Sequence, residues 1–254
     1  LLDRAKKLKL ITRVGVGLDN IPFEETAKRG IKISYTPDAP TLAVAELTIG
    51  FMIDGLRMFS FVDRGIRNQE WNKYMGGLLK DRTVGIIGVG RIGKNLIKLL
   101  QPFGVRILGN DLVEDNDFAS KYNFKYVDKD TLYKESDIVT LHLSCSDSTY
   151  HLVDKKALSQ LKSNAILINA ARGGAVDEDA LYDVLESKKI AGAVLDVYEK
   201  EPYKGKLATL ENTILTAHIG AGTYESRRNM EVGAVEEVIR FHRGEPLLHE
   251  IDHN

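Results

Sequence analysis

Arg172, Glu201 and His218 are side chains whose chemistry suits a reaction on a small carboxylic acid. A guanidinium can hold a carboxylate through two parallel hydrogen bonds, and an imidazole exchanges a proton near neutral pH. A carboxylate beside the imidazole would orient its ring. The three residues follow three different apolar runs, so this chemistry depends on a fold that brings the ends of those runs together.

A second group of residues has the spacing of a dinucleotide-binding turn. Its glycines, in the pattern GxGxxG, are Gly88, Gly90 and Gly93. The pattern directly follows an apolar run, residues 83–87, and opens a helix-like segment, residues 91–100. Asp111 ends the next apolar run, at the distance expected for a dinucleotide-binding βαβ unit. This context favours a dinucleotide site over a glycine turn without a ligand.

Each position of this motif has a physical role in binding a dinucleotide. The first glycine permits the tight turn, the second lets the pyrophosphate approach the backbone, and the third lets helix and strand pack closely. The amides of Arg91 and Ile92 lie where a helix N-terminus favours an anion. Asp111 would accept hydrogen bonds from the adenosine ribose and repel a 2′-phosphate, so the sequence predicts NAD in preference to NADP.

Short apolar runs alternate with helix-like segments over most of the chain. The runs are residues 83–88, 105–110, 137–143, 165–169, 191–196 and 213–217. Several are apolar at consecutive positions, which is typical of strands buried on both faces of a parallel sheet. The alternation predicts an α/β fold with right-handed crossovers.

The last three runs end in the reactive side chains. Ligands of open α/β sheets bind beyond the carboxyl ends of the strands, so we expect Arg172, Asp196, Glu201 and His218 at the edge that holds the glycine motif. Three of these residues also have a structural alternative. Arg172 would then be a salt-bridge partner, His218 would cap a strand end, and Glu201 would be a solvated turn residue.

Composition narrows the classes of function. The chain has 254 residues, with 35 basic and 36 acidic side chains and a net charge of −1, which argues against a nucleic-acid binder with a broad basic surface. No stretch of about 18 apolar residues is present to span a membrane, and no His, Cys and Asp cluster has metal-ligand spacing. The single cysteine, Cys145, excludes an internal disulfide, fits a reducing, cytoplasmic environment, and is expected to be a small buried thiol.

The first part of the chain has a different pattern. Residues 9–14 and 31–34 are predicted strands, joined by a short helix over residues 22–29. Residues 41–68 are then apolar on most faces, which predicts helix covered on several sides, between domains or against another subunit. An ordinary pair of core helices is the alternative.

These residues resemble the D-isomer-specific 2-hydroxyacid dehydrogenase family, in particular its D-3-phosphoglycerate dehydrogenase branch. The matching segments are residues 13–20 (RVGVGLDN), 45–47 (AEL), 88–93 (GVGRIG), 169–177 (NAARGGAVD), 196–202 (DVYEKEP) and 218–221 (HIGA). The resemblance implies a Rossmann-type doubly wound parallel sheet and an incomplete flavodoxin-like substrate domain. Residues 1–36 and 221–254 would belong to the substrate domain and residues 37–220 to the NAD-binding domain.

The resemblance also assigns roles to single residues. The family's catalytic side chains fall on Arg172, Glu201 and His218, and its nicotinamide-contacting aspartate falls on Asp196. Its other cofactor contacts fall on Gly88, Gly90, Arg91, Ile92, Gly93, Asp111, Ala170, Ala171 and Gly220, besides Arg172 and His218. The backbone of Val16 and Gly17, with Arg172, would bind the substrate carboxylate. No metal ligand is implied.

Two departures from the family pattern stand out. Ser144 replaces a proline that commonly follows the strand near His142, which affects the shape of the cofactor-side loop. The chain also begins at Leu1, partway through the family's longer N-terminal substrate domain, so we expect further residues before it.

The resemblance implies an NAD-dependent oxidoreductase that interconverts a D-2-hydroxy acid and its 2-keto acid. Arg13 lies near the loop that would bind the carboxylate and could meet a phosphate, so 3-phosphoglycerate is the first substrate hypothesis. Glyoxylate or hydroxypyruvate reduction, and an NAD-sensing protein similar to corepressors of this fold, are alternatives. A homodimer is expected from the family and from the apolar stretch, with neither nucleic acid nor membrane as a partner.

Overall fold

The computed structural model describes residues 2–144 and 146–251, so Cys145 lies outside the described residues. The chain divides into two compact units. The first, Val44–Gly220, is called the contiguous unit; the second, Leu1–Ala43 with Ala221–Asn254, is called the split unit. The candidate catalytic and dinucleotide-binding side chains all belong to the contiguous unit.

A parallel sheet forms the centre of the contiguous unit. Its strands are β3 (Thr83–Ile87), β4 (Arg106–Asn110), β5 (Lys125–Tyr126), β6 (Ile138–Leu141), β7 (Ile166–Asn169), β8 (Gly192–Leu195) and β9 (Thr213–Leu215). They lie in the order β5-β4-β3-β6-β7-β8-β9, and each neighbouring pair is parallel. The predicted α/β fold with a doubly wound parallel sheet is confirmed.

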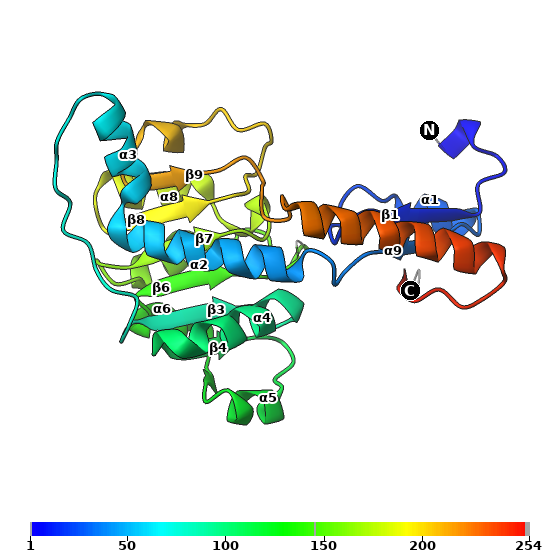
Figure 1. Cartoon of the computed structure of the whole chain (residues 1–254), viewed down its shortest axis with the longest axis horizontal. Helices are drawn as coiled ribbons and strands as arrows, with labels where there is room; N and C mark the ends of the chain where they lie inside the picture. The colour runs from blue at the N-terminus through cyan, green and yellow to red at the C-terminus, as the bar shows by residue number, and fades with distance from the viewer. Residues whose placement is uncertain (1, 145, 252–254) are drawn as a thin grey trace. The chain divides into compact units, whose positions relative to one another are not determined.

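Helices cover both faces of this sheet (Figure 1). They are α2 (Thr41–Arg57), α3 (Phe59–Arg67), α4 (Arg91–Leu100), α5 (Asn116–Lys121), α6 (Lys129–Glu135), α7 (Lys155–Gln160) and α8 (Glu178–Glu186). Neighbouring strand residues enter different cores. Ile86 packs in the core with α2 and α4, whereas Ile87 packs in the core with α6, α7 and α8. Both faces of the sheet are therefore covered by helices, which explains why its strands have apolar residues at consecutive positions.

The apolar stretch 41–68 forms two helices of unlike character. The helix breaks at Met58, whose φ of 53° is left-handed. Helix α2 contributes Phe51 and Met52 to the core that it shares with α4 and Ile86. In contrast, α3 has no buried residue, so the described part of this chain does not cover it, and coverage by another subunit stays a prediction. Charged residues, Asp63, Arg64 and Arg67, lie among the apolar residues of α3, and apolar Phe59 and Ile66 are exposed.

The split unit has its own three-stranded sheet. Its elements are β1 (Leu10–Arg13), α1 (Phe23–Lys28), β2 (Lys32–Tyr35), α9 (Tyr224–His242) and β10 (Glu250–Ile251). The strand order is β1-β2-β10, with β1 parallel and β10 antiparallel to β2. Helix α9 packs on β1 and β2. The predicted strands 9–14 and 31–34 and helix 22–29 are present, each within one or two residues.

Local sequence defines where several helices begin. Helices α5, α6, α7, α8 and α9 each follow a residue whose side chain accepts a backbone N–H of the first turn: Asp115, Asp128, Asp154, Asp177 and Thr223. Such caps replace hydrogen bonds that a helix start lacks. None of the helices in residues 2–144 and 146–251 is both long and apolar enough to cross a membrane.

Candidate active site

The glycine turn joins β3 to α4 and is shaped by close backbone contacts. Gly88 has a φ of +93°, and a Cβ there would lie 2.2 Å from the carbonyl oxygen of His142. A Cβ on Gly93 would lie 2.2 Å from the carbonyl oxygen of Gly88. A Cβ on Gly90 would meet nothing within 4 Å, so open space lies in front of its backbone. This space and the start of α4 at Arg91 fit a dinucleotide pyrophosphate.

Asp111 follows β4 and is held by the same turn. Its Oδ2 accepts a hydrogen bond from the Val89 amide at 2.6 Å, and its Oδ1 accepts one from Val113 at 3.3 Å. A cavity of about 710 Å³ borders the turn, with Asp111 and Arg91 among its lining residues. The acid that the sequence assigns to the ribose therefore lies in the cavity that begins at the glycine turn.

His218 and Glu201 form a hydrogen-bonded pair beyond β8 and β9. Nδ1 of His218 lies 2.9 Å from Oε2 of Glu201, and the amide of Tyr198 donates to Oε1 at 3.2 Å. Both side chains are partly exposed. Because Nδ1 faces a carboxylate, we assign the tautomer with a proton on Nδ1, which leaves Nε2 to exchange a proton with a ligand.

Asp196 holds the backbone of the histidine turn. Its side chain is 0% exposed. Oδ1 accepts hydrogen bonds from Thr216 Oγ1 at 2.5 Å and Ile219 N at 2.8 Å, and Oδ2 accepts one from Gly220 N at 2.7 Å. His218 itself has a left-handed φ of 54°. Few residues other than glycine adopt this conformation, and the hydrogen bonds of Asp196 to the neighbouring amides stabilise it. Asp196 is thus a positioning residue for His218.

Arg172 lies in a loop that the end of β7 fixes. The side chain of Asn169 donates to the Arg172 carbonyl at 2.9 Å and accepts from the Ala171 amide at 3.1 Å. The guanidinium donates to the Ala171 carbonyl at 2.7 Å, and Ala170 and Ala171 are buried. Asn169 was not singled out as a site residue; a polar residue ending a fully buried strand is the sequence signal that identifies it.

Gly173 brings the arginine loop against the glutamate loop. A Cβ on Gly173 would lie 1.8 Å from the carbonyl carbon of Tyr198, so only a glycine permits this approach. The backbone after Arg172 therefore touches the backbone that holds Glu201. Of the residues singled out from the sequence, the structure connects Glu201, His218 and Asp196 by hydrogen bonds and Arg172 by this contact.

Val16 and Gly17 lie in the split unit, in the loop after β1. The loop is tied to β2 because the Gly15 amide donates to Thr36 Oγ1 at 2.8 Å. Gly15 has a φ of +130°, and a Cβ there would lie 3.2 Å from the Arg13 guanidinium. Arg13 Nη1 also donates to the Val14 carbonyl. Arg13 thus contacts the loop that follows it.

His142, directly after β6, is a buried residue near the glycine turn. Burial lowers the pKa of its ring to about 4, and its Nε2 lies 3.1 Å from Thr140 Oγ1. It is therefore neutral near pH 7 and fits the packing role expected from the sequence. Among the described residues, no group of three or more His, Cys, Asp or Glu side chains is arranged to hold a metal ion.

Comparisons with known proteins identify the family. Residues 49–220 match the model of the D-isomer specific 2-hydroxyacid dehydrogenase, NAD binding domain. The chain is 40% identical over 255 residues to a glyoxylate reductase of Thermococcus litoralis, covering 96% of this chain and 77% of that one. It is 38% identical over 248 residues to a D-3-phosphoglycerate dehydrogenase of Methanocaldococcus jannaschii, covering 96% of this chain and 47% of that one.

The fold matches solved structures of the same kind. An NADPH-dependent glyoxylate/hydroxypyruvate reductase of Sinorhizobium meliloti, solved with NADP and malonate, superposes with a TM-score of 0.91 at 28% identity. The match covers 99% of this chain and 80% of that structure. The glycine turn, the ribose-side acid and the His218–Glu201 pair thus lie on the NAD(P)-binding fold that the family model describes. The chain belongs to the D-isomer specific 2-hydroxyacid dehydrogenase family of oxidoreductases.

Proposed function

We propose that the protein interconverts a small D-2-hydroxy acid and its 2-keto acid, with NAD as the cofactor. The observation that carries this proposal is the His218–Glu201 pair, whose atoms lie 2.9 Å apart at the carboxyl edge of the sheet. A bound nicotinamide would supply or accept the hydride at the substrate C2. The protein's own residues bind the acid and move the proton.

The roles of these residues follow from their positions. In oxidation, His218 Nε2 takes the hydroxyl proton, and in reduction it returns the proton to the carbonyl oxygen. Glu201 keeps Nδ1 protonated and stabilises the imidazolium that forms. Arg172 binds the substrate carboxylate and polarises the carbonyl. The loop of Val16 and Gly17 keeps the carboxylate-binding role that the family resemblance implies. Asp196 acts through the turn that carries His218.

The contacts of Arg13 bear on the choice between a phosphorylated and an unphosphorylated substrate. The sequence favours 3-phosphoglycerate because this cation could meet a phosphate. In the structure Arg13 donates to the Val14 carbonyl and lies against Gly15. It therefore supports the loop of Val16 and Gly17, and we infer from this loop-support role an unphosphorylated substrate such as glyoxylate or hydroxypyruvate. The glyoxylate reductase of Thermococcus litoralis, 40% identical, supports the same choice.

The test is NADH oxidation by the protein from its complete reading frame, followed by absorbance. The panel contains glyoxylate, hydroxypyruvate, pyruvate and 3-phosphohydroxypyruvate. Turnover of glyoxylate or hydroxypyruvate supports the proposal. Selective turnover of 3-phosphohydroxypyruvate would overturn the choice of substrate and restore 3-phosphoglycerate. NADH binding without turnover of any member would overturn the dehydrogenase function and favour the NAD-sensing alternative.

Arg13→Ala is expected to raise KM for every 2-keto acid on the panel by about tenfold, since it removes a charged hydrogen bond that supports the carboxylate-binding loop. The measurement is KM for glyoxylate and for 3-phosphohydroxypyruvate, with Arg13→Lys as the variant that keeps the charge. A rise in KM confined to the phosphorylated substrate would contradict the loop-support role.

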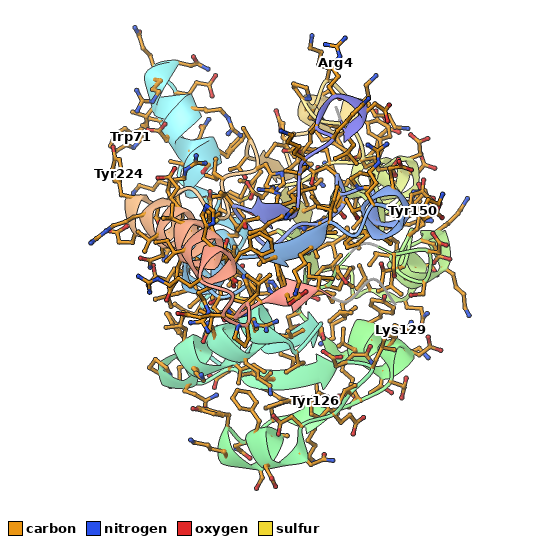
Figure 2. The ribbon with its side chains drawn as sticks, turned by 90° about the vertical axis from the view of Figure 1, so that its right-hand side faces the viewer. Arg4, Trp71, Tyr126, Lys129, Tyr150 and Tyr224 are labelled. Carbon is orange, nitrogen blue, oxygen red and sulfur yellow. The ribbon has the colours of Figure 1, made fainter. Side chains whose placement is uncertain are left out.

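We also propose that two copies associate through the apolar surface of α3 and the segment after it. Its exposed apolar side chains are Phe59, Ile66, Trp71, Tyr74, Met75 and Leu78. Trp71 is 81% exposed and lies at the outer edge of the view in Figure 2. A group of exposed apolar side chains on one part of a monomer typically marks an interaction site.

Light scattering is expected to give the mass of a dimer for the wild type and of a monomer for Trp71→Glu/Met75→Glu. Tyr224→Glu, which changes an exposed aromatic side chain of the split unit, serves as the control and should remain dimeric. A monomeric wild type at micromolar concentration would count against this interface.

A further inference from the structure

The cavity beside the glycine turn contains charges of both signs. Its charged lining residues are Arg91, Lys94, Asp111, Glu114, Asp115 and Asp117. Lys94 belongs to the first turn of α4, because its amide donates to the Gly90 carbonyl at 2.9 Å. Asp115 belongs to the segment that follows Asp111 after β4. The cavity that contains Asp111, the residue assigned to the adenosine ribose, is therefore lined by a lysine as well as by acids.

The Lys94 ammonium is held by Asp115. Nζ of Lys94 donates to Oδ2 of Asp115 in an ion pair. This hydrogen bond, together with the Phe118 amide, holds the pKa of the Asp115 carboxyl below its usual value. The ammonium also lies 5.1 Å from the centre of the Phe118 ring.

Asp115 is itself fixed by the backbone of the next helix. Its Oδ1 accepts the Phe118 amide at 3.0 Å and caps α5. Its own amide donates to the hydroxyl of Tyr126 at 3.2 Å; Tyr126 is labelled in Figure 2. Both ends of Asp115 are thus anchored, and the carboxylate that pairs with Lys94 is held in place.

We propose that the Lys94–Asp115 ion pair is a second determinant of cofactor choice, acting with Asp111 against NADP. The inference rests on the proposed preference for NAD. A 2′-phosphate is stabilised by cations within its reach, and of the two cations that line this cavity, Arg91 and Lys94, the lysine is already paired with Asp115. An NADP phosphate would face the Asp111 charge and would also have to compete with Asp115 for Lys94.

This arrangement predicts that the two acids are coupled. Asp111→Ser alone removes one repulsive charge but leaves Lys94 paired. Asp115→Asn releases the lysine and still caps α5, since asparagine is a good N-cap residue. Only when both substitutions are combined does a 2′-phosphate meet a lysine that is not paired with Asp115 and lose the repulsion of the Asp111 charge.

The experiment measures dissociation constants of NADPH and NADH by titration calorimetry for the wild type, both single variants and the double variant. Asp111→Ser is expected to improve the NADPH-to-NADH affinity ratio about tenfold, and Asp115→Asn alone only slightly. The change in this affinity ratio for the double variant should exceed the product of the changes for the two single variants by about tenfold. Adding Lys94→Met to the double variant should remove that excess. Thermal unfolding of each variant confirms that α5 and the unit remain folded.

The possible failures are distinguishable. The inference would be overturned if the affinity ratio of the double variant changed only by the product of the two single changes. It would also be overturned if the excess persisted after Lys94→Met. Either result would leave the preference for NAD intact. A wild type that binds NADPH as tightly as NADH would overturn the proposed preference itself. An unchanged ratio in Asp111→Ser would remove the role assigned to Asp111.

Discussion

His218→Ala is expected to lower kcat by about 10²- to 10⁴-fold while NADH still binds. The substitution removes the only group assigned to take the substrate hydroxyl proton, and general acid–base catalysis typically supplies an effect of this size. Glu201, 2.9 Å from the missing ring, cannot replace it because it points its oxygens at His218 and the Tyr198 amide. Steady-state kcat and calorimetric titration with NADH measure the two effects separately.

Two variants give this prediction its controls. Glu201→Gln keeps a hydrogen-bond acceptor near Nδ1 but removes the charge, so we expect a smaller loss of kcat than for His218→Ala. His242→Ala removes an exposed histidine of α9 and should leave kcat unchanged. Wild-type turnover by His218→Ala in a stopped-time assay would refute the assignment of the proton carrier.

Gly173→Ala is expected to destabilise the protein by about 3 kcal/mol, at the upper end of overpacking penalties. The new Cβ would lie 1.8 Å from the carbonyl carbon and 1.9 Å from the oxygen of Tyr198, and backbone atoms cannot move aside as a flexible side chain can. Relief would separate the loops that carry Arg172 and Glu201, so kcat should fall as well. Denaturant unfolding and steady-state kinetics measure both losses.

Gly50→Ala is the matched control for this substitution. Gly50 lies within α2, and a Cβ there would meet nothing within 4 Å. Alanine in an exposed helix interior is favoured over glycine by about 1 kcal/mol, so this variant should be slightly more stable. If Gly173→Ala unfolded at the wild-type denaturant concentration, the two loops would have to be less closely packed than the structure shows.

The sequence predicted the framework of the site more fully than its contacts. Apolar runs located the strands, and the rule that ligands bind beyond parallel strand ends correctly predicted that Glu201 and His218 would lie together. The GxGxxG spacing likewise predicted that Asp111 would lie beside the glycine turn. These features depend on local pattern and on topology, which one sequence can reveal.

The remaining features depend on tertiary contacts that no local pattern encodes. The hydrogen bonds of Asp196 to the histidine turn, and the contact of Gly173 with Tyr198, join loops that are separate in sequence. Met58, where the helix breaks, is neither glycine nor proline, so the residue type does not predict the break. The different exposure of α2 and α3 could not be predicted either, because the prediction treated residues 41–68 as one apolar stretch and did not locate the break that separates the charged segment 63–67 from α2.

The split unit also has a consequence for synthesis on the ribosome. The contiguous unit, Val44–Gly220, contains all strands of its own sheet and can complete its core as soon as its residues have emerged. Strands β1 and β2 emerge earlier, yet β2 pairs with β10 and packs against α9, and both of these elements follow the contiguous unit in the chain. The edge of β2 that pairs with β10 therefore stays unpaired until the contiguous unit has been made. During that interval it can pair with strands of other chains, which is a risk that chaperones reduce.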